Sequence, residues 1–106
     1  MNVDADIQVW LETVAGTQPS VIVPYVQSAG GGPLHYEIQA VREGPQGRAV
    51  IRQGSNVTLA AGKPTALGNM AISRSSGETC DIVIFITGKE GSLPESGRSY
   101  QFPCPD

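Results

Sequence analysis

The sequence predicts an all-β fold, and three observations support that prediction. Apolar and polar residues alternate with a period of two along most of the chain, as in strands that bury one face. Thirteen glycines and eight prolines fall largely between the alternating segments, where these residue types indicate turns. No stretch of about ten residues carries an apolar stripe at helical spacing.

Three strands are expected in the first part of the chain. Residues 7–12 alternate through Ile7, Val9 and Leu11, and residues 21–26 form a second apolar run. Because Pro24 has no N–H to donate to a ladder, we expect this second strand to lie at a sheet edge or to carry a bulge. After the glycine turn at residues 29–33, residues 34–41 form a third strand.

The remaining strands follow at short intervals. Turns at residues 44–47 and 61–64 enclose a short fourth strand at 48–53 and a fifth at 57–59, and the pattern continues through 66–73. The strongest strand is 80–87, and the last is 98–104. Seven to eight short strands within 106 residues predict a single domain, residues 1–106, folded as an immunoglobulin-like antiparallel β-sandwich. An up-and-down barrel is the alternative, although it usually needs more chain.

The two cysteines fall at matching positions of the last two strands. If these strands form a hairpin centred near Ser92, the numbers of opposed residues sum to about 184, and Cys80 lies opposite Cys104. Directly opposed Cβ atoms are within disulfide range. We therefore expect a disulfide, worth roughly 3 kcal/mol for a loop of this length, and an oxidising compartment. The alternative is a pair of buried, reduced thiols.

Composition excludes several classes of function. The net charge is −3 and the seven basic residues are scattered, so neither nucleic acid nor an anionic membrane is an expected partner. No apolar run approaches the roughly 20 residues needed to span a bilayer. Residues 1–4 show no signal-peptide pattern, which fits either a cytosolic start or a mature form.

The residues offer no recognisable catalytic, metal or cofactor site. His35 is the only histidine, and with two paired cysteines it does not complete a zinc site; a surface position on a strand explains it. Gly62-Lys63 lacks the upstream glycine of a phosphate-binding loop. The pair Glu90 and Glu95 is expected in a solvated loop, and the glycosylation pattern that begins at Asn56 is short enough to arise by chance. We therefore predict that the protein is not an enzyme and needs no cofactor.

Three arginines are the candidate binding residues. Arg42, Arg48 and Arg52 lie on the third and fourth strands around the turn at 44–47, and Arg74 is a further basic residue that we expect nearby. If the two strands pair, some of these guanidinium groups share one exposed face, where they can pair with carboxylates or stack on amides and aromatics. The alternative is ordinary solvated charge that discourages edge-to-edge aggregation.

Several short motifs together resemble a known family. The segment 48–62, RAVIRQGSNVTLAAG, has an Arg-Gln-Gly turn before a short strand and an Ala-Gly turn after it. Together with residues 21–26, 67–73 and 80–87, this pattern is similar to that of the periplasmic curli amyloid-assembly inhibitors of the CsgH/CsgC type.

The resemblance implies a specific role. It implies a periplasmic, monomeric immunoglobulin-like sandwich that binds the curli major subunit weakly and transiently and holds it in a non-amyloid state. It also implies that Arg42, Arg48 and Arg52 guide the partner electrostatically. The chain departs from the family in being net acidic and in lacking the C-x-C motif of the enterobacterial branch, so any attraction has to be local.

Two other hypotheses remain open from the sequence. The first is a structural or adhesive immunoglobulin-like module of a fimbrial or cell-surface system. The second is an enzyme that depends on His35, which a hydrolytic activity lost in His35→Ala would reveal.

Overall fold

The structure is a computed structural model that describes residues 7–14, 16, 20–72, 76–88 and 97–104. In this part of the chain every regular element is a strand, which confirms the all-β prediction. The eight strands are, in chain order, β1 (Gln8–Val14), β2 (Val21–Gln27), β3 (Gly32–Gly44), β4 (Gly47–Leu59), β5 (Thr65–Ala66), β6 (Met70–Ala71), β7 (Thr79–Gly88) and β8 (Arg98–Pro103).

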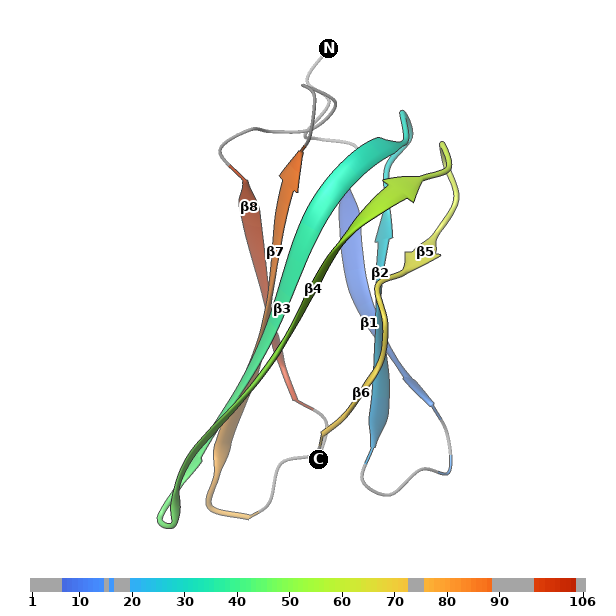
Figure 1. The fold of residues 1–106 in the computed structure, drawn as a ribbon. Coiled ribbons are helices and arrows are strands. Elements are labelled where there is room, and N and C mark those ends of the chain that lie inside the picture. Colours follow the sequence, from blue (N-terminus) through green and yellow to red (C-terminus); the bar gives the residue numbers. More distant parts are fainter. Residues whose placement is uncertain (1–6, 15, 17–19, 73–75, 89–96, 105–106) are drawn as a thin grey trace.

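The strands form two antiparallel sheets of four strands each, packed as two layers (Figure 1). Sheet A has β2 in the middle, with β1 on one side and the two short strands β5 and β6 on the other. Sheet B has the order β4-β3-β7-β8, so β4 and β8 form its edges. The predicted antiparallel sandwich is therefore confirmed.

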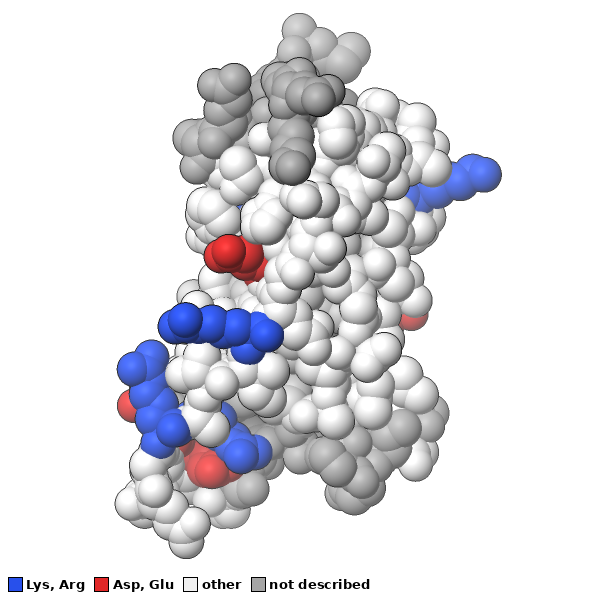
Figure 2. All heavy atoms as spheres, in the orientation of Figure 1, with Lys and Arg blue, Asp and Glu red and all other residues white. Residues whose placement is uncertain are grey.

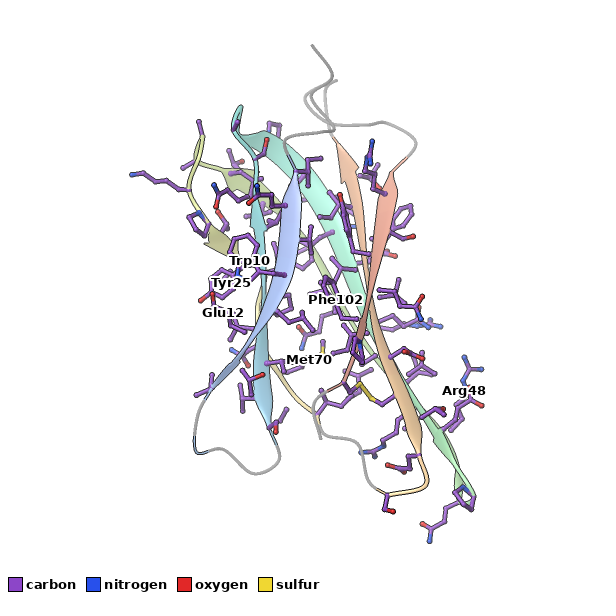
Figure 3. The ribbon with its side chains drawn as sticks, turned by 180° about the vertical axis from the view of Figure 1, so that it is seen from behind. Trp10, Glu12, Tyr25, Arg48, Met70 and Phe102 are labelled. Carbon is purple, nitrogen blue, oxygen red and sulfur yellow. A yellow bond between two sulfur atoms is a disulfide. The ribbon has the colours of Figure 1, made fainter. Side chains whose placement is uncertain are left out.

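The core lies between the two sheets and follows from the alternation in the sequence. In β7 the even-numbered residues face inward and the odd-numbered residues face outward, because successive side chains of a strand point to opposite faces. Figure 3 shows Met70 among the side chains between the layers. The buried apolar residues are Ile7, Ile22, Val26, Leu34, Ile38, Ala40, Leu59, Leu67, Met70, Ile72, Cys80, Ile82, Ile84, Ile86 and Cys104.

The predicted hairpin and disulfide are both present. β7 pairs with β8 in the register Ile82 with Phe102 and Ile84 with Tyr100, whose residue numbers sum to 184. Cys80 and Cys104 are disulfide-bonded with a Cα–Cα distance of 5.4 Å, and the Cys104 N–H donates to the Cys80 carbonyl at 3.1 Å. The bond fixes the C-terminal end of β8 to the start of β7.

The prediction for Pro24 was wrong about its place in the sheet. β2 is the central strand of sheet A, and it pairs with β1 residue for residue, without a bulge. The Pro24 carbonyl accepts a hydrogen bond from the Leu67 N–H at 2.8 Å, so its missing N–H also points away from β1. That side is occupied by β5 and β6, which pair with β2 on either side of Pro24 and leave a gap opposite it. The sheet accommodates the proline by interrupting its partner strand.

Two strand boundaries also differ from the prediction. We expected a fourth strand at 48–53 and a fifth at 57–59, but they are one continuous strand, β4. The residues between them, Gly54, Ser55 and Asn56, stay paired with β3 in the same register. Conversely, the segment expected at 66–73 is divided into the short strands β5 and β6. The observed total of eight strands in the described residues thus comes from a different division of the chain.

Candidate functional site

The edge strand β4 is the most exposed of the long strands. All of residues 47–52 are exposed. By contrast β3, the one described strand that pairs with β4, is buried at every core-facing position from Leu34 to Ala40 except the half-buried Tyr36. Figure 1 shows why: toward the turn that joins them, β3 and β4 lean away from β1 and β2, so sheet A does not cover this end of the hairpin.

The register divides the three predicted arginines between two faces. Arg48 lies opposite Glu43 and Arg52 lies opposite Gln39, which places both arginines on the outer face of sheet B. Arg42 lies opposite Ala49 and Cys80, and therefore on the other face of the hairpin. Figure 3 shows Arg48 projecting from the hairpin on the side away from β1 and β2. The structure thus brings two of the three arginines together on one exposed face.

The charges around the three arginines differ. The Arg48 Nε atom lies 3.9 Å from a Glu43 carboxylate oxygen, and the Arg42 Nε atom lies 3.8 Å from a Glu78 carboxylate oxygen. Arg52 forms no ion pair with any other residue in the described part of the chain. Surface ion pairs of this kind are worth little and exchange readily, so Arg48 and Arg52 remain available to an acidic partner.

Two hollows accompany the arginines. The first is lined by Glu37, Ile38, Gln39, Arg52, Gln53 and Gly54, the last of which has no side chain. The second lies at the end of the hairpin and is lined by Arg42, Gln46, Gly47, Arg48, Ala49 and Glu78. Arg42 and Arg48 therefore reach a common hollow, although their strands direct them to opposite faces.

Apolar side chains are interspersed with these charges. Val50, between Arg48 and Arg52 on the outer face, is 40% exposed, and Phe85 on β7 is equally exposed. Ile51, on the opposite face of β4, is 38% exposed. Figure 2 shows the basic side chains gathered toward the turn end of the β3–β4 hairpin, with largely uncharged surface over most of the rest of the described part of this view. The site is thus an exposed edge strand with two outward-facing arginines and Val50 between them, next to the carboxylates of Glu37 and Glu43 on β3.

The outer face of sheet A has a different character. Trp10 and Tyr25 lie opposite each other on β1 and β2, and their rings stack with centroids 5.6 Å apart. The Trp10 indole N–H donates to Glu12 at 3.0 Å. Figure 3 shows this group on the opposite side of the molecule from Arg48.

Of the other sequence motifs, the structure describes His35, Asn56 and Gly62-Lys63. His35 lies on the outer face of β3, where its Nδ1 atom is 3.0 Å from the Asn56 Oδ1 atom and its Nε2 atom is 3.7 Å from a Glu37 oxygen. Among the described residues, no three His, Cys, Asp or Glu side chains are grouped to hold a metal ion. Gly62 and Lys63 lie in the turn after β4, while Arg74, Glu90 and Glu95 lie outside the described residues. No helix of the described chain is long and apolar enough to cross a membrane.

Sequence reasoning missed the free edge of β4. Val50 and Gly54 share the outer face with Arg48 and Arg52, and all four border an open edge because only one described strand pairs with β4. The alternation Arg48-x-Val50-x-Arg52 is visible in the sequence and places the three residues on one face. The order of the strands in the sheet cannot be seen in any local sequence pattern.

Comparison with known proteins gives a family and a fold. Residues 3–95 match the Tafi-CsgC family, described as thin aggregative fimbriae synthesis protein. The structure is similar to the E. coli curli protein CsgC, with a TM-score of 0.74, 23% sequence identity, and coverage of 92% of this chain and 98% of that one. It is also similar to the solution structure of R. palustris CsgH, with a TM-score of 0.67, 14% identity, and coverage of 92% and 91%. A search of curated proteins gives no match.

The family match extends over most of the sequence, from before β1 to shortly before β8. The chain therefore belongs to the thin aggregative fimbriae synthesis family, and the CsgC/CsgH resemblance seen in its motifs is confirmed.

Proposed function

We propose that this member of the fimbriae synthesis family is a periplasmic chaperone that keeps the curli major subunit out of the amyloid state. Family membership supports a role in curli assembly, and the disulfide between Cys80 and Cys104 fits an oxidising compartment. The protein acts as a monomer through weak and transient binding, and no catalysis is required.

The observation that carries the proposal is the basic, exposed edge of sheet B. Arg48 and Arg52 project from a long strand that has no neighbour on one side in the described structure. An amyloid fibril grows when subunits add as strands to its exposed edges. A protein that covers such an edge on an early oligomer therefore stops growth. Even weak binding suffices where it acts on rare early oligomers.

The three arginines differ in their expected contributions. Arg48 and Arg52 act together on the outer face of sheet B, whereas Arg42 approaches from the other face and is engaged with Glu78. We therefore expect the pair on the outer face to supply most of the attraction for an acidic segment of the partner, with Arg42 adding a smaller part. Because the whole chain is net acidic, this attraction is local to the arginines. It weakens as salt increases, because dissolved ions screen exposed charges.

The test is a thioflavin-T time course of purified curli major subunit with this protein added well below equimolar. We expect the lag to lengthen several-fold, and the effect to fall in Arg48→Ala/Arg52→Ala and further in the triple variant that also carries Arg42→Ala. Lys63→Ala is the matched control, because it removes an exposed positive charge from the turn after β4. An unchanged lag at every ratio of the native protein would refute the proposal.

A further inference from the structure

The free edge of β4 has the features of a docking site for an extended polypeptide. We propose that residues Arg48 to Asn56 accept one segment as an added strand, and that they select a segment with two acidic residues four positions apart and an apolar residue midway between them. This inference rests on the proposed function for the identity of the natural partner, and it adds the mode and the sequence preference of binding.

The geometry of the β3–β4 hairpin sets which backbone groups are free. The hairpin closes with Gly44 opposite Gly47 around a two-residue turn. In such a hairpin the closing pair exchanges both hydrogen bonds, and hydrogen-bonded and non-hydrogen-bonded pairs then alternate. The even-numbered residues of β4, from Arg48 to Thr58, consequently direct their N–H and C=O groups away from β3, toward the open edge.

Pro33 agrees with this assignment. It lies opposite Thr58 in a pair that the alternation makes non-hydrogen-bonded, so its missing N–H removes no bond between β3 and β4. Among the described residues, the register of β3 with β7 runs from Glu43 to Leu34. The proline therefore sits where β4 requires no donor from it.

The side chains beside the free backbone groups define the preferred segment. Arg48, Val50 and Arg52 project from the same face at intervals of two residues, so the two arginines are about 13 Å apart along the strand. A strand added at this edge places residues i, i+2 and i+4 beside them. Carboxylates at i and i+4 pair with the arginines, and an apolar side chain at i+2 packs on Val50, which is 40% exposed.

The hollow beside Arg52 adds one more position to the sequence that we expect the bound segment to have. Gly54 continues the same row of outward-facing residues but has no side chain, and the hollow there is bordered by Glu37 and Gln39 of β3. A long amide or aromatic side chain two positions beyond one of the carboxylates fits this space. The tightest ligand therefore carries a bulky residue next to the acidic–apolar–acidic pattern.

A second copy of this chain does not fit the edge equally well. Antiparallel pairing of two β4 strands centred on Val50 sets Arg48 against Arg52, and pairing centred on either arginine sets that residue against itself. Like charges directly opposite each other destabilise a strand pair. In these registers the residues that attract an acidic segment disfavour self-association. A register centred on Ile51 sets Val50 against Arg52 and opposes no arginines, so self-association is an outcome that the experiment has to test.

The probe is a seven-residue blocked peptide with glutamate at its second and sixth positions, valine at its fourth, and threonine elsewhere. We expect saturable NMR shifts of the protein's amides concentrated on the even-numbered residues of β4. A peptide with lysine in place of both glutamates tests the charge pattern. A peptide N-methylated on the residues whose N–H groups face β4 tests strand addition, and we expect each change to weaken binding about tenfold or more.

A pair of protein variants tests the same edge from the other side. Val50→Pro removes an N–H that points to the open edge and leaves the hydrogen bonds to β3 in place, while Val50→Thr keeps the N–H and the preference for strand. We expect Val50→Pro to weaken peptide binding about tenfold and Val50→Thr to weaken it far less. Where Val50→Pro does not fold, the N-methylated peptide gives the answer with the native protein.

The outcomes separate this inference from the proposed function. If Val50→Pro is folded and inhibits curli-subunit aggregation as well as the native protein does, while Arg48→Ala/Arg52→Ala does not, strand addition is wrong and the chaperone role stands. If the peptide docks on β4 but the native protein leaves the subunit's lag unchanged, the docking edge stands and the chaperone role is wrong. Shifts outside β4, or a concentration-dependent dimer joined through β4, would overturn the inference.

Discussion

β4 and β7 flank the same strand and have opposite surroundings. Both pair with β3 over most of its length, and both are long strands of sheet B. In β7, Ile82, Ile84 and Ile86 are fully buried, and β8 protects its other edge. In β4, the first six residues are exposed on both faces, and no described strand pairs with its other edge.

The difference separates what holds the fold together from the surface that we propose meets a partner. β7 is fixed by side-chain burial on one face, by backbone pairing on both edges, and by a disulfide. The exposed half of β4 is held mainly by backbone pairing to β3, since its side chains bury little surface. We therefore expect substitutions in that half to change the proposed binding with little effect on stability, whereas substitutions on the inner face of β7 should destabilise the protein.

The largest expected effect comes from truncating matched isoleucines on the two strands. Ile84→Ala in β7 removes a side chain that is completely buried, and we expect it to lower the free energy of unfolding by about 4 kcal/mol, within the usual range for such changes. Ile51→Ala in β4 makes the same chemical change at a side chain that is 38% exposed, and we expect a loss of about 1 kcal/mol or less. Urea unfolding followed by tryptophan fluorescence measures both.

Both variants replace isoleucine by alanine and so lose the same strand preference. The difference between their losses in the free energy of unfolding therefore reports burial. Equal destabilisation by Ile51→Ala and Ile84→Ala would mean that the end of the β3–β4 hairpin is covered in solution. That result would contradict the contrast between the strands, and it would remove the exposed surface on which the docking site depends.

The second expected effect concerns the covalent link that β7 has and β4 lacks. Replacing both cysteines, as Cys80→Ala/Cys104→Ala, is expected to lower the free energy of unfolding by about 3 kcal/mol, because the open chain regains the conformational entropy of a loop that spans 24 residues in sequence. Thermal unfolding of the native protein with and without a reductant gives an independent measure. A native protein whose melting temperature is indifferent to reduction would show that the disulfide does not restrain the unfolded chain.

The same contrast explains which parts of the fold could be predicted from the sequence. The register of β7 and β8 follows from their alternation and from the two cysteines. A shift by one residue would turn every buried side chain to the solvent face. The exposed part of β4 has no such constraint, and the Gly54-Ser55-Asn56 stretch resembles a break although β3 keeps it in register. The place of Pro24 depended on where β5 ends and β6 begins, which is decided by tertiary packing.

The candidate site was predictable in composition but not in geometry. Arg42, Arg48 and Arg52 are evident as a basic group around one turn, and the alternation places Arg48 and Arg52 on the same face once the strand is known. That β4 lies at an edge follows from the strand order of sheet B, which depends on long-range pairing. The free backbone groups that the docking proposal uses therefore became visible only in the structure.

The smallest expected effect concerns the ion pair across the β3–β4 hairpin. Arg48 and Glu43 are both about 60% exposed, and their closest charged atoms are 3.9 Å apart, so a double-mutant cycle with Arg48→Ala and Glu43→Ala should give a coupling of about 0.5 kcal/mol or less. Raising the salt concentration should reduce it further. A coupling well above 1 kcal/mol would mean that Arg48 is committed to Glu43, and that Arg52 alone offers charge to a partner. A coupling near zero instead leaves Arg48 able to exchange Glu43 for a carboxylate on an incoming strand.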